Sequence, residues 1–144
     1  MDDAERRIIR QDCEALSIAY ARAVDFRDYD EFSNLFLEEG TLEAGVRLQG
    51  RAAIAASLKR RPDELRSRHV LTNIFINVIN RDEANGISYL TLYRHVGPES
   101  TLSGPVKLDG PFGIGHYQDV FMRTSDGWRF KSRVLHMAFQ RDTT

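Results

Sequence analysis

The strongest constraint on the fold is the order of two hydrophobic periodicities along the chain. Residues 4–24 predict a helix, because apolar side chains recur there at helical spacing on one face: Ile9, Cys13, Leu16, Tyr20 and Val24. After residue 62, alternating and apolar-rich segments are typical of β-strands. Helices that precede the strands indicate an α+β protein, in which an antiparallel sheet packs against N-terminal helices.

Local signals predict the individual elements. Asp28 is the expected N-cap of a second short helix, with Glu31 as its capping-box partner. Two short strands or a hairpin are expected around Ala44-Gly45, followed by a third helix over 51–61 that Pro62 stops. Further strands are predicted over 68–80, 87–96, 114–124 and 128–140, and the last two form a hairpin. The long connection 97–113 is expected to be either a functional lid or a disordered segment.

The strand over 68–80 has two unequal faces if its residues alternate strictly. One face is almost fully apolar: Val70, Thr72, Ile74, Ile76 and Val78. The other mixes polar and apolar groups: His69, Leu71, Asn73, Phe75, Asn77 and Ile79.

Composition narrows the class of protein. A chain of 144 residues is most simply one domain, over 1–144. Its net charge of −1 favours neither nucleic acid nor an anionic membrane as a partner. The N-terminus lacks the apolar core of a signal peptide, and no apolar run approaches membrane-spanning length. The single cysteine, Cys13, is expected to be a core thiol in a reducing compartment, so we expect a cytoplasmic protein.

Several motif signals are weak. The glycines of "GPFGIG" lack the strand and helix that a dinucleotide-binding loop needs. The basic residues between 59 and 68 are interpreted as a solvated surface. The four histidines have no metal-ligand spacing, so no metal site is predicted, and no nucleophile motif occurs.

Asp25 and His69 are ambiguous from the residues alone. Asp25 lies about 140° around the helix from Tyr20, at 100° per residue, so periodicity favours an exposed carboxylate. A lone histidine at the start of a strand is more often a hydrogen-bonded structural residue. If the two side chains met, the carboxylate would fix the imidazole tautomer and leave the other ring nitrogen free to take a proton.

An ordered series of short motifs changes this balance. The series runs Y-x-x-x-V-D, D-x-x-x-F, R-H-V-x-T-N, Y-x-D and D-G-W-x-F, with a following R-V. It resembles the nuclear transport factor 2-like superfamily over nearly the whole chain. The closest resemblance is to its SnoaL-like branch, which contains scytalone dehydratase, bile acid 7α-dehydratase and hexachlorocyclohexane dehydrochlorinase. The resemblance implies a cone-shaped, curved antiparallel sheet that encloses a pocket closed by helices.

The resemblance also implies roles for particular residues. Asp25 and His69 match the family's catalytic aspartate–histidine pair, and Tyr20 matches a catalytic phenol of the bile acid dehydratase. The dehydrochlorinase has a lysine at that position, and this difference argues against dehalogenation as the reaction of this chain. Arg133 matches an active-site arginine, and His95 a second histidine. Small-molecule pockets are lined mostly by apolar side chains with a few polar groups. Together with the resemblance, this suggests the following substrate-binding residues, with Gln118 as a pocket amide: Leu42, Asn73, Phe75, Phe112, Gln118, Leu135, Met137 and Phe139.

The function expected from these residues is a cofactor-independent lyase. It would eliminate water from a small hydrophobic, cyclic substrate with a His–Asp general base, and would form a homodimer or homotrimer. The alternatives are an isomerase like ketosteroid isomerase, or a non-catalytic binding or accessory protein of the same fold. A distance beyond about 5 Å between the Asp25 carboxylate and the His69 ring, with no cavity beside them, would exclude the enzyme.

Overall fold

Residues 1–142, which the computed structural model describes, begin with two helices, continue with two short strands and a third helix, and end with four long strands. The helices are α1 (Asp3–Asp25), α2 (Tyr29–Asn34) and α3 (Arg51–Lys59), with a 3-10 helix η1 (Pro98–Thr101). The strands are β1 (Phe36–Ala44), β2 (Val46–Gln49), β3 (Leu65–Val78), β4 (Glu83–Val96), β5 (Gly113–Thr124) and β6 (Gly127–Gln140). The order of elements confirms the predicted α+β class.

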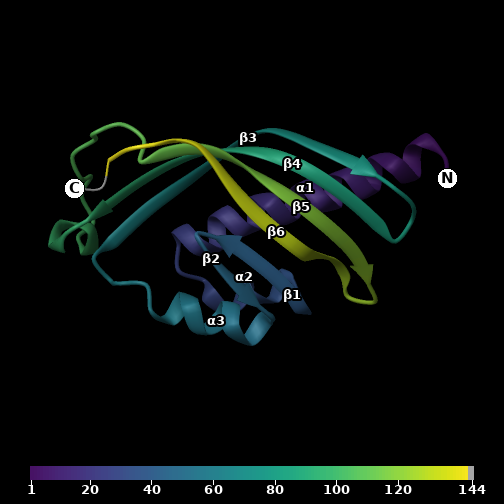
Figure 1. Cartoon of the computed structure of the whole chain (residues 1–144), viewed down its shortest axis with the longest axis horizontal. Helices are drawn as coiled ribbons and strands as arrows, with labels where there is room; N and C mark the ends of the chain where they lie inside the picture. Colours follow the sequence, from purple (N-terminus) through teal and green to yellow (C-terminus); the bar gives the residue numbers. More distant parts are fainter. Residues whose placement is uncertain (143–144) are drawn as a thin grey trace.

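The strands form one curved, unclosed sheet in the order β2-β1-β6-β5-β4-β3 (Figure 1). The β1–β2 and β5–β6 hairpins are confirmed, and every neighbouring pair is antiparallel except β1 with β6. That parallel pair departs from the predicted antiparallel sheet. β1 pairs with the last strand of the chain, and no local turn signal in the sequence predicts a pairing over that distance.

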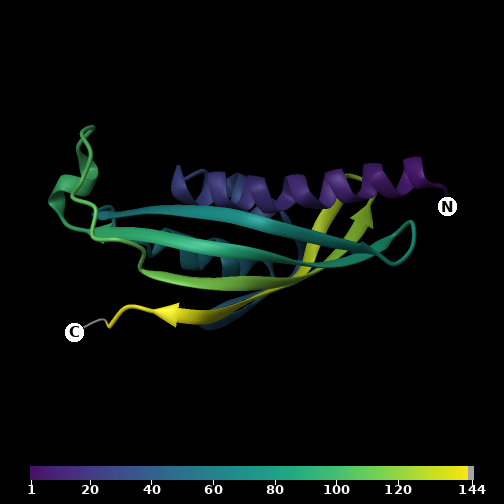
Figure 2. The same cartoon turned by 90° about the horizontal axis from the view of Figure 1, so that it is seen from above.

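Helix α1 lies along one face of the sheet (Figure 2). Its predicted inner stripe is buried at Ile9, Cys13, Leu16, Tyr20 and Val24, and packs into the main core. Burial raises the pKa of the Cys13 thiol to about 12. This residue is therefore a core thiol, as predicted.

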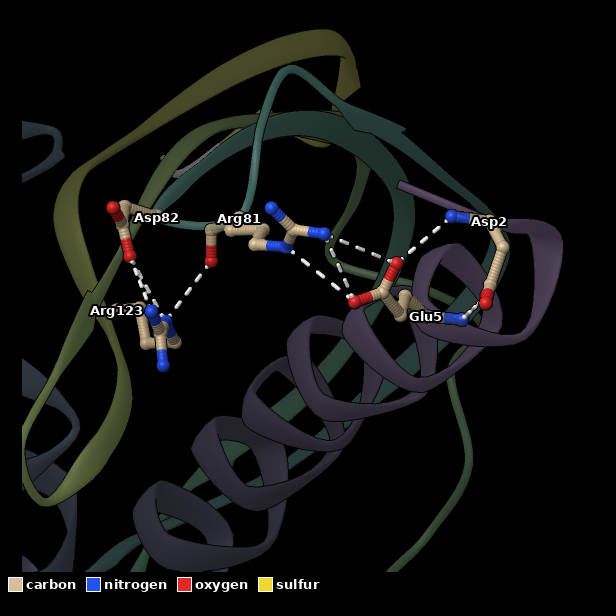
Figure 3. Close-up of polar contacts among 5 residues, drawn as sticks. All are labelled: Asp2, Glu5, Arg81, Asp82 and Arg123. Carbon is tan, nitrogen blue, oxygen red and sulfur yellow. Dashed lines mark hydrogen bonds and ion pairs between the residues drawn. The ribbon is translucent and has the colours of Figure 1, made fainter.

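Polar contacts fasten the first turn of α1 to the β3–β4 turn (Figure 3). The Asp2 side chain accepts from the backbone of Glu5, and the Glu5 carboxylate accepts from the backbone of Asp2, which is a capping box. The guanidinium of Arg81 donates to Glu5 at 3.2 Å, and Arg123 pairs with Asp82 at 2.6 Å. Exposed pairs of this kind each stabilise little, and they connect the first turn of α1, the β3–β4 turn and the end of β5.

A β-bulge at Asn73 divides β3 into two halves. The pairing with β4 shifts by one residue between Thr72 and Phe75, and Asn73 has a left-handed φ of 51°. Asparagine tolerates this conformation better than most residues. Before the bulge the odd-numbered residues face the helix side, including His69, whereas after it the even-numbered residues such as Ile76 do so. The prediction of strict alternation along this strand is therefore wrong.

The connection between β4 and β5 extends from one end of the sheet, near the described C-terminal end of the chain (Figures 1 and 2). The Arg66 guanidinium donates to backbone carbonyls of Ser100, Leu102 and Gly104 at 3.0, 2.6 and 2.9 Å. One cation therefore holds three backbone carbonyls of this connection against β3.

The face of the sheet away from α1 carries exposed apolar side chains, among them Val70, Ile87, Tyr89 and Ile114. The predicted homo-oligomer would cover such a face, and it stays a prediction. No helix in residues 1–142 is both long and apolar enough to cross a membrane.

Candidate active site

Asp25 is the last residue of α1, and its carboxylate contacts residues near the beginning of β3. Its Oδ1 lies 2.6 Å from Nδ1 of His69 and accepts a hydrogen bond from the Ser67 hydroxyl at 2.8 Å. Its Oδ2 accepts from the backbone N–H of His69 at 2.7 Å. Three hydrogen bonds therefore hold one carboxylate against two consecutive inward-facing residues of the strand.

The helical wheel fails for Asp25 because α1 is covered on two flanks. The Tyr20 flank packs into the core, and the start of β3 lies along a second flank, where Asp25 projects. The Asp25 side chain is only 6% exposed and the His69 side chain 10%. Periodicity within one helix predicts only the widest buried face of that helix. It cannot predict contact with a strand that begins forty residues later in the sequence.

Electrostatics favour the ionised form of the Asp25 carboxylate. Burial by itself raises the pKa of Asp25, but the hydrogen bond and charge of His69 outweigh burial, and the pKa lies below its ordinary value. The carboxylate is thus ionised at neutral pH, and the hydrogen between it and His69 belongs to Nδ1. The other ring nitrogen, Nε2, then carries the lone pair and has no hydrogen-bond partner within residues 1–142.

His69 and Tyr20 line a cavity of about 530 Å³ between the helices and the sheet. This volume falls within the range of about 300–1,000 Å³ that is typical of small-molecule sites. Four residues predicted to bind substrate contribute to the wall: Leu42, Phe112, Leu135 and Met137. The wall is completed mainly by further apolar residues and by three arginines: Val24, Phe32, Val46, Leu48, Leu58, Leu92, Arg60, Arg61 and Arg94.

Two phenols, Tyr20 and Tyr117, stand beside His69 in the cavity. The ring of Tyr20 lies edge-on to His69, with 6.3 Å between centroids, and 5.4 Å from the ring of Tyr117. Burial raises the pKa of both phenols, and the charge of Arg133 counteracts part of that rise. Both side chains therefore remain neutral hydrogen-bond donors at physiological pH.

Arg133 is sealed beneath these phenols, because it is 0% exposed and is not among the cavity-lining residues. Its guanidinium donates to Asp119 at 2.8 and 3.1 Å, and to the Ser17 hydroxyl at 3.1 Å. Its central carbon lies 4.3 Å from the ring centroid of Tyr20 and 3.9 Å from that of Tyr117. The expectation that Arg133 contacts substrate does not fit this position, because the guanidinium lies behind the two phenols and does not line the cavity.

Five other predicted site residues lie outside this cavity. His95 pairs with Glu99 at 2.8 Å and with the Ser100 hydroxyl, and so helps to hold η1. The bulge turns Asn73 and Phe75 outward, and Phe75 is 67% exposed. Gln118 points away from the helices, between the inward-facing Tyr117 and Asp119. Phe139 is likewise exposed.

Several residues of the site were not predicted from the sequence. Arg61 was interpreted as part of a solvated basic cluster, yet it is half-buried and donates to Ser67 at 3.1 Å. Tyr117 and Asp119 were recognised only as a Y-x-D motif. Alternation along that strand was the available signal, because it places a phenol and a carboxylate on one buried face. Within the described residues, no three His, Cys, Asp or Glu side chains converge to hold a metal ion.

Comparison with known proteins agrees with the motif order in the sequence. The sequence pattern of the SnoaL-like domain matches residues 6–134, and no curated protein matches significantly. An NTF2-like protein with a cystatin-like fold from Novosphingobium aromaticivorans shares 25% identity, covering 100% of this chain and 94% of that chain, with a TM-score of 0.74.

Two further solved structures carry enzyme names. A candidate scytalone dehydratase from N. aromaticivorans shares 20% identity over 99% of this chain and 93% of that chain, with a TM-score of 0.80. A hexachlorocyclohexane dehydrochlorinase of type 3 from Novosphingobium barchaimii shares 15% identity over 97% and 93%, with a TM-score of 0.79. At such identities the likeness establishes the shared fold.

Proposed function

Because this chain belongs to the SnoaL-like domain family, we propose that it is a cofactor-independent lyase that eliminates water from a small hydrophobic, cyclic substrate. The observation that carries the proposal is the 2.6 Å contact between Asp25 Oδ1 and His69 Nδ1 at the wall of a cavity. A protein that only binds a ligand has no need of a buried, oriented base.

In this reaction, Nε2 of His69 removes a proton from a carbon next to an electron-withdrawing group such as a carbonyl. Asp25 stabilises the resulting imidazolium and keeps its ring in place. The electron pair of the broken C–H bond forms the new double bond as the C–O bond breaks. The leaving oxygen departs with its electron pair and takes the proton back from Nε2, so the products are an alkene and water.

The phenol of Tyr20 donates a hydrogen bond to the enolate oxygen that develops, or to the leaving oxygen. Such a donor gains strength in a cavity from which water is excluded. The buried cation of Arg133, 4.3 Å from the Tyr20 ring centroid, favours negative charge on this side of the cavity. Arg133 is thus a positioning residue that acts through the two phenols.

A panel of hydroxylated cyclic ketones tests the proposal, with loss of water followed by mass spectrometry. We expect His69→Ala to lower kcat/KM by about a hundred- to ten-thousandfold, which is the usual contribution of a general base. Asp25→Asn should lower it less, because the histidine remains but loses its orienting charge. A matched control is His136→Ala, which removes an exposed histidine on the other face of the sheet.

The outcomes separate the remaining alternatives. Turnover that survives both substitutions excludes the Asp25–His69 base. A product of unchanged mass with a moved double bond assigns an isomerase to the same pair. Saturable binding without any turnover makes the protein a binding or accessory member of the family.

A further inference from the structure

Three guanidinium groups gather at one side of the cavity, at Arg60, Arg61 and Arg94. Arg60 and Arg61 follow the end of α3, and Arg94 projects from β4 with its guanidinium 4.8 Å from the ring centroid of Phe112, which also lines the cavity. Within residues 1–142, no aspartate or glutamate lines the cavity and none of the three arginines forms an ion pair. This part of the wall therefore carries positive charge with no acidic side chain in the cavity lining to pair with it.

Arg61 is the innermost of the three and is incompletely satisfied. It is half-buried, and its Nε is buried with no hydrogen-bond partner within residues 1–142. Partial burial, followed by repulsion from Arg61, lowers the pKa of Arg94, although the residue remains exposed on its solvent side. A buried donor and two cations that repel each other cost free energy in the empty cavity, and an anion between them would relieve both costs.

We propose that the substrate carries an anionic group, a carboxylate or a phosphate, that binds to Arg61 and Arg94, while its apolar body extends toward His69. This inference names the substrate class and rests on the proposed function. Guanidinium groups suit such a ligand because they form paired, charge-assisted hydrogen bonds with carboxylate and phosphate oxygens.

The geometry also sets how far the anionic group lies from the base. Arg61 donates to Ser67, and Ser67 and His69 face the same side of β3 two residues apart. Two strand residues span about 7 Å. The carbon that loses its proton therefore lies within a few bonds of the anionic group, so the substrate is a compact cyclic acid or phosphate rather than a long amphiphile.

Titration calorimetry with the full chain tests this inference without requiring turnover. The probes are 1-naphthoate, its uncharged methyl ester and 1-naphthyl phosphate, which share one bicyclic body. We expect at least one of the two anions to bind about tenfold more tightly than the ester, which is the usual gain from one charge-assisted hydrogen bond. Tighter binding of naphthoate assigns a carboxylate, and tighter binding of the phosphate assigns a phosphate ester.

Variants locate the effect. Arg61→Met and Arg94→Met should each weaken binding of the preferred anion about tenfold and change binding of the ester less than about threefold. Arg10→Met, which removes an exposed guanidinium from α1, should change neither. Equal affinity for anion and ester, equal losses for both probes, or no binding of any probe would overturn the inference. His69→Ala should retain the anion preference, so failure of the proposed elimination and failure of the anion site are separately visible.

Discussion

Two aspartates of this chain each pair with a nitrogen base, one beside the cavity and one inside the core. Asp25 meets His69, whose second ring nitrogen remains free to exchange a proton. Asp119 meets Arg133, which is permanently charged and has no route to solvent. A buried carboxylate is therefore not by itself evidence of a catalytic role. What matters is whether its partner can titrate and whether that partner reaches a cavity.

Breaking the core pair should have the largest effect on stability. Arg133→Met leaves the Asp119 carboxylate buried without its cation, so we expect the free energy of unfolding to fall by about 3–5 kcal/mol. Urea denaturation measures it. His69→Gln should cost only about 1 kcal/mol, because Asp25 keeps the hydrogen bonds from Ser67 and the backbone N–H.

A paired replacement sharpens this test. Asp119→Leu together with Arg133→Met removes both charges and should recover most of the stability that the single change loses. If Arg133→Met alone is as stable as the parent, the core pair is not the structural element that we infer.

Each pair also forms a hydrogen bond with a serine hydroxyl, which gives a matched test of smaller effect. Ser67 donates to Asp25, and Ser17 accepts from Arg133. Replacing either serine with alanine should cost about 1 kcal/mol of stability. Only Ser67→Ala should also lower turnover, because only that hydroxyl orients the base. Equal turnover in the two variants would break the distinction between the pairs.

Carboxyl titration followed by carbon NMR gives the subtlest comparison. The midpoint of Asp25 should lie below the ordinary value of 3.8, because His69 holds the ionised form. The midpoint of Asp119 should lie above 3.8, because burial raises its pKa more than Arg133 lowers it. Midpoints in the reverse order would contradict both assignments.

These directions have opposite consequences for stability. The folded pKa of Asp25 is depressed, so its contribution is present above the unfolded value and is lost as pH falls through the folded pKa. The folded pKa of Asp119 is raised, so its contribution is present below the unfolded value and is lost as pH rises through the folded pKa. Asp25→Asn should therefore make the loss of stability in acid shallower.

Local patterns predicted the elements because they depend on neighbours in sequence. The stripe of α1, the Asp28 cap and the Ser125-Asp126-Gly127 turn all report contacts within a few residues, and all are present. The parallel pairing of β1 with β6 was not predicted, because it joins segments about ninety residues apart, for which a single sequence carries no local signal.

The site was only partly predictable for the same reason. Asp25 and His69 were assigned by family resemblance, and their own periodicities favoured structural roles. Arg133 has the right neighbours in sequence but is sealed behind Tyr20 and Tyr117. From the sequence alone, Arg61 is interpreted as a surface charge. Its partial burial depends on contact with β3, which a local pattern does not predict.

The bulge at Asn73 makes the length of β3 part of the site. It adds one residue to β3, so that the inward-facing positions change from odd-numbered to even-numbered. His69 and Ile76 therefore both face inward although they are seven residues apart. A strand with the same number of residues but no bulge would force either the base or the core residue to the outside, whereas deleting Asn73 would leave both facing inward along a regular strand. The position of the histidine therefore depends on the bulge that accommodates the extra residue, as well as on the side chains of the cavity.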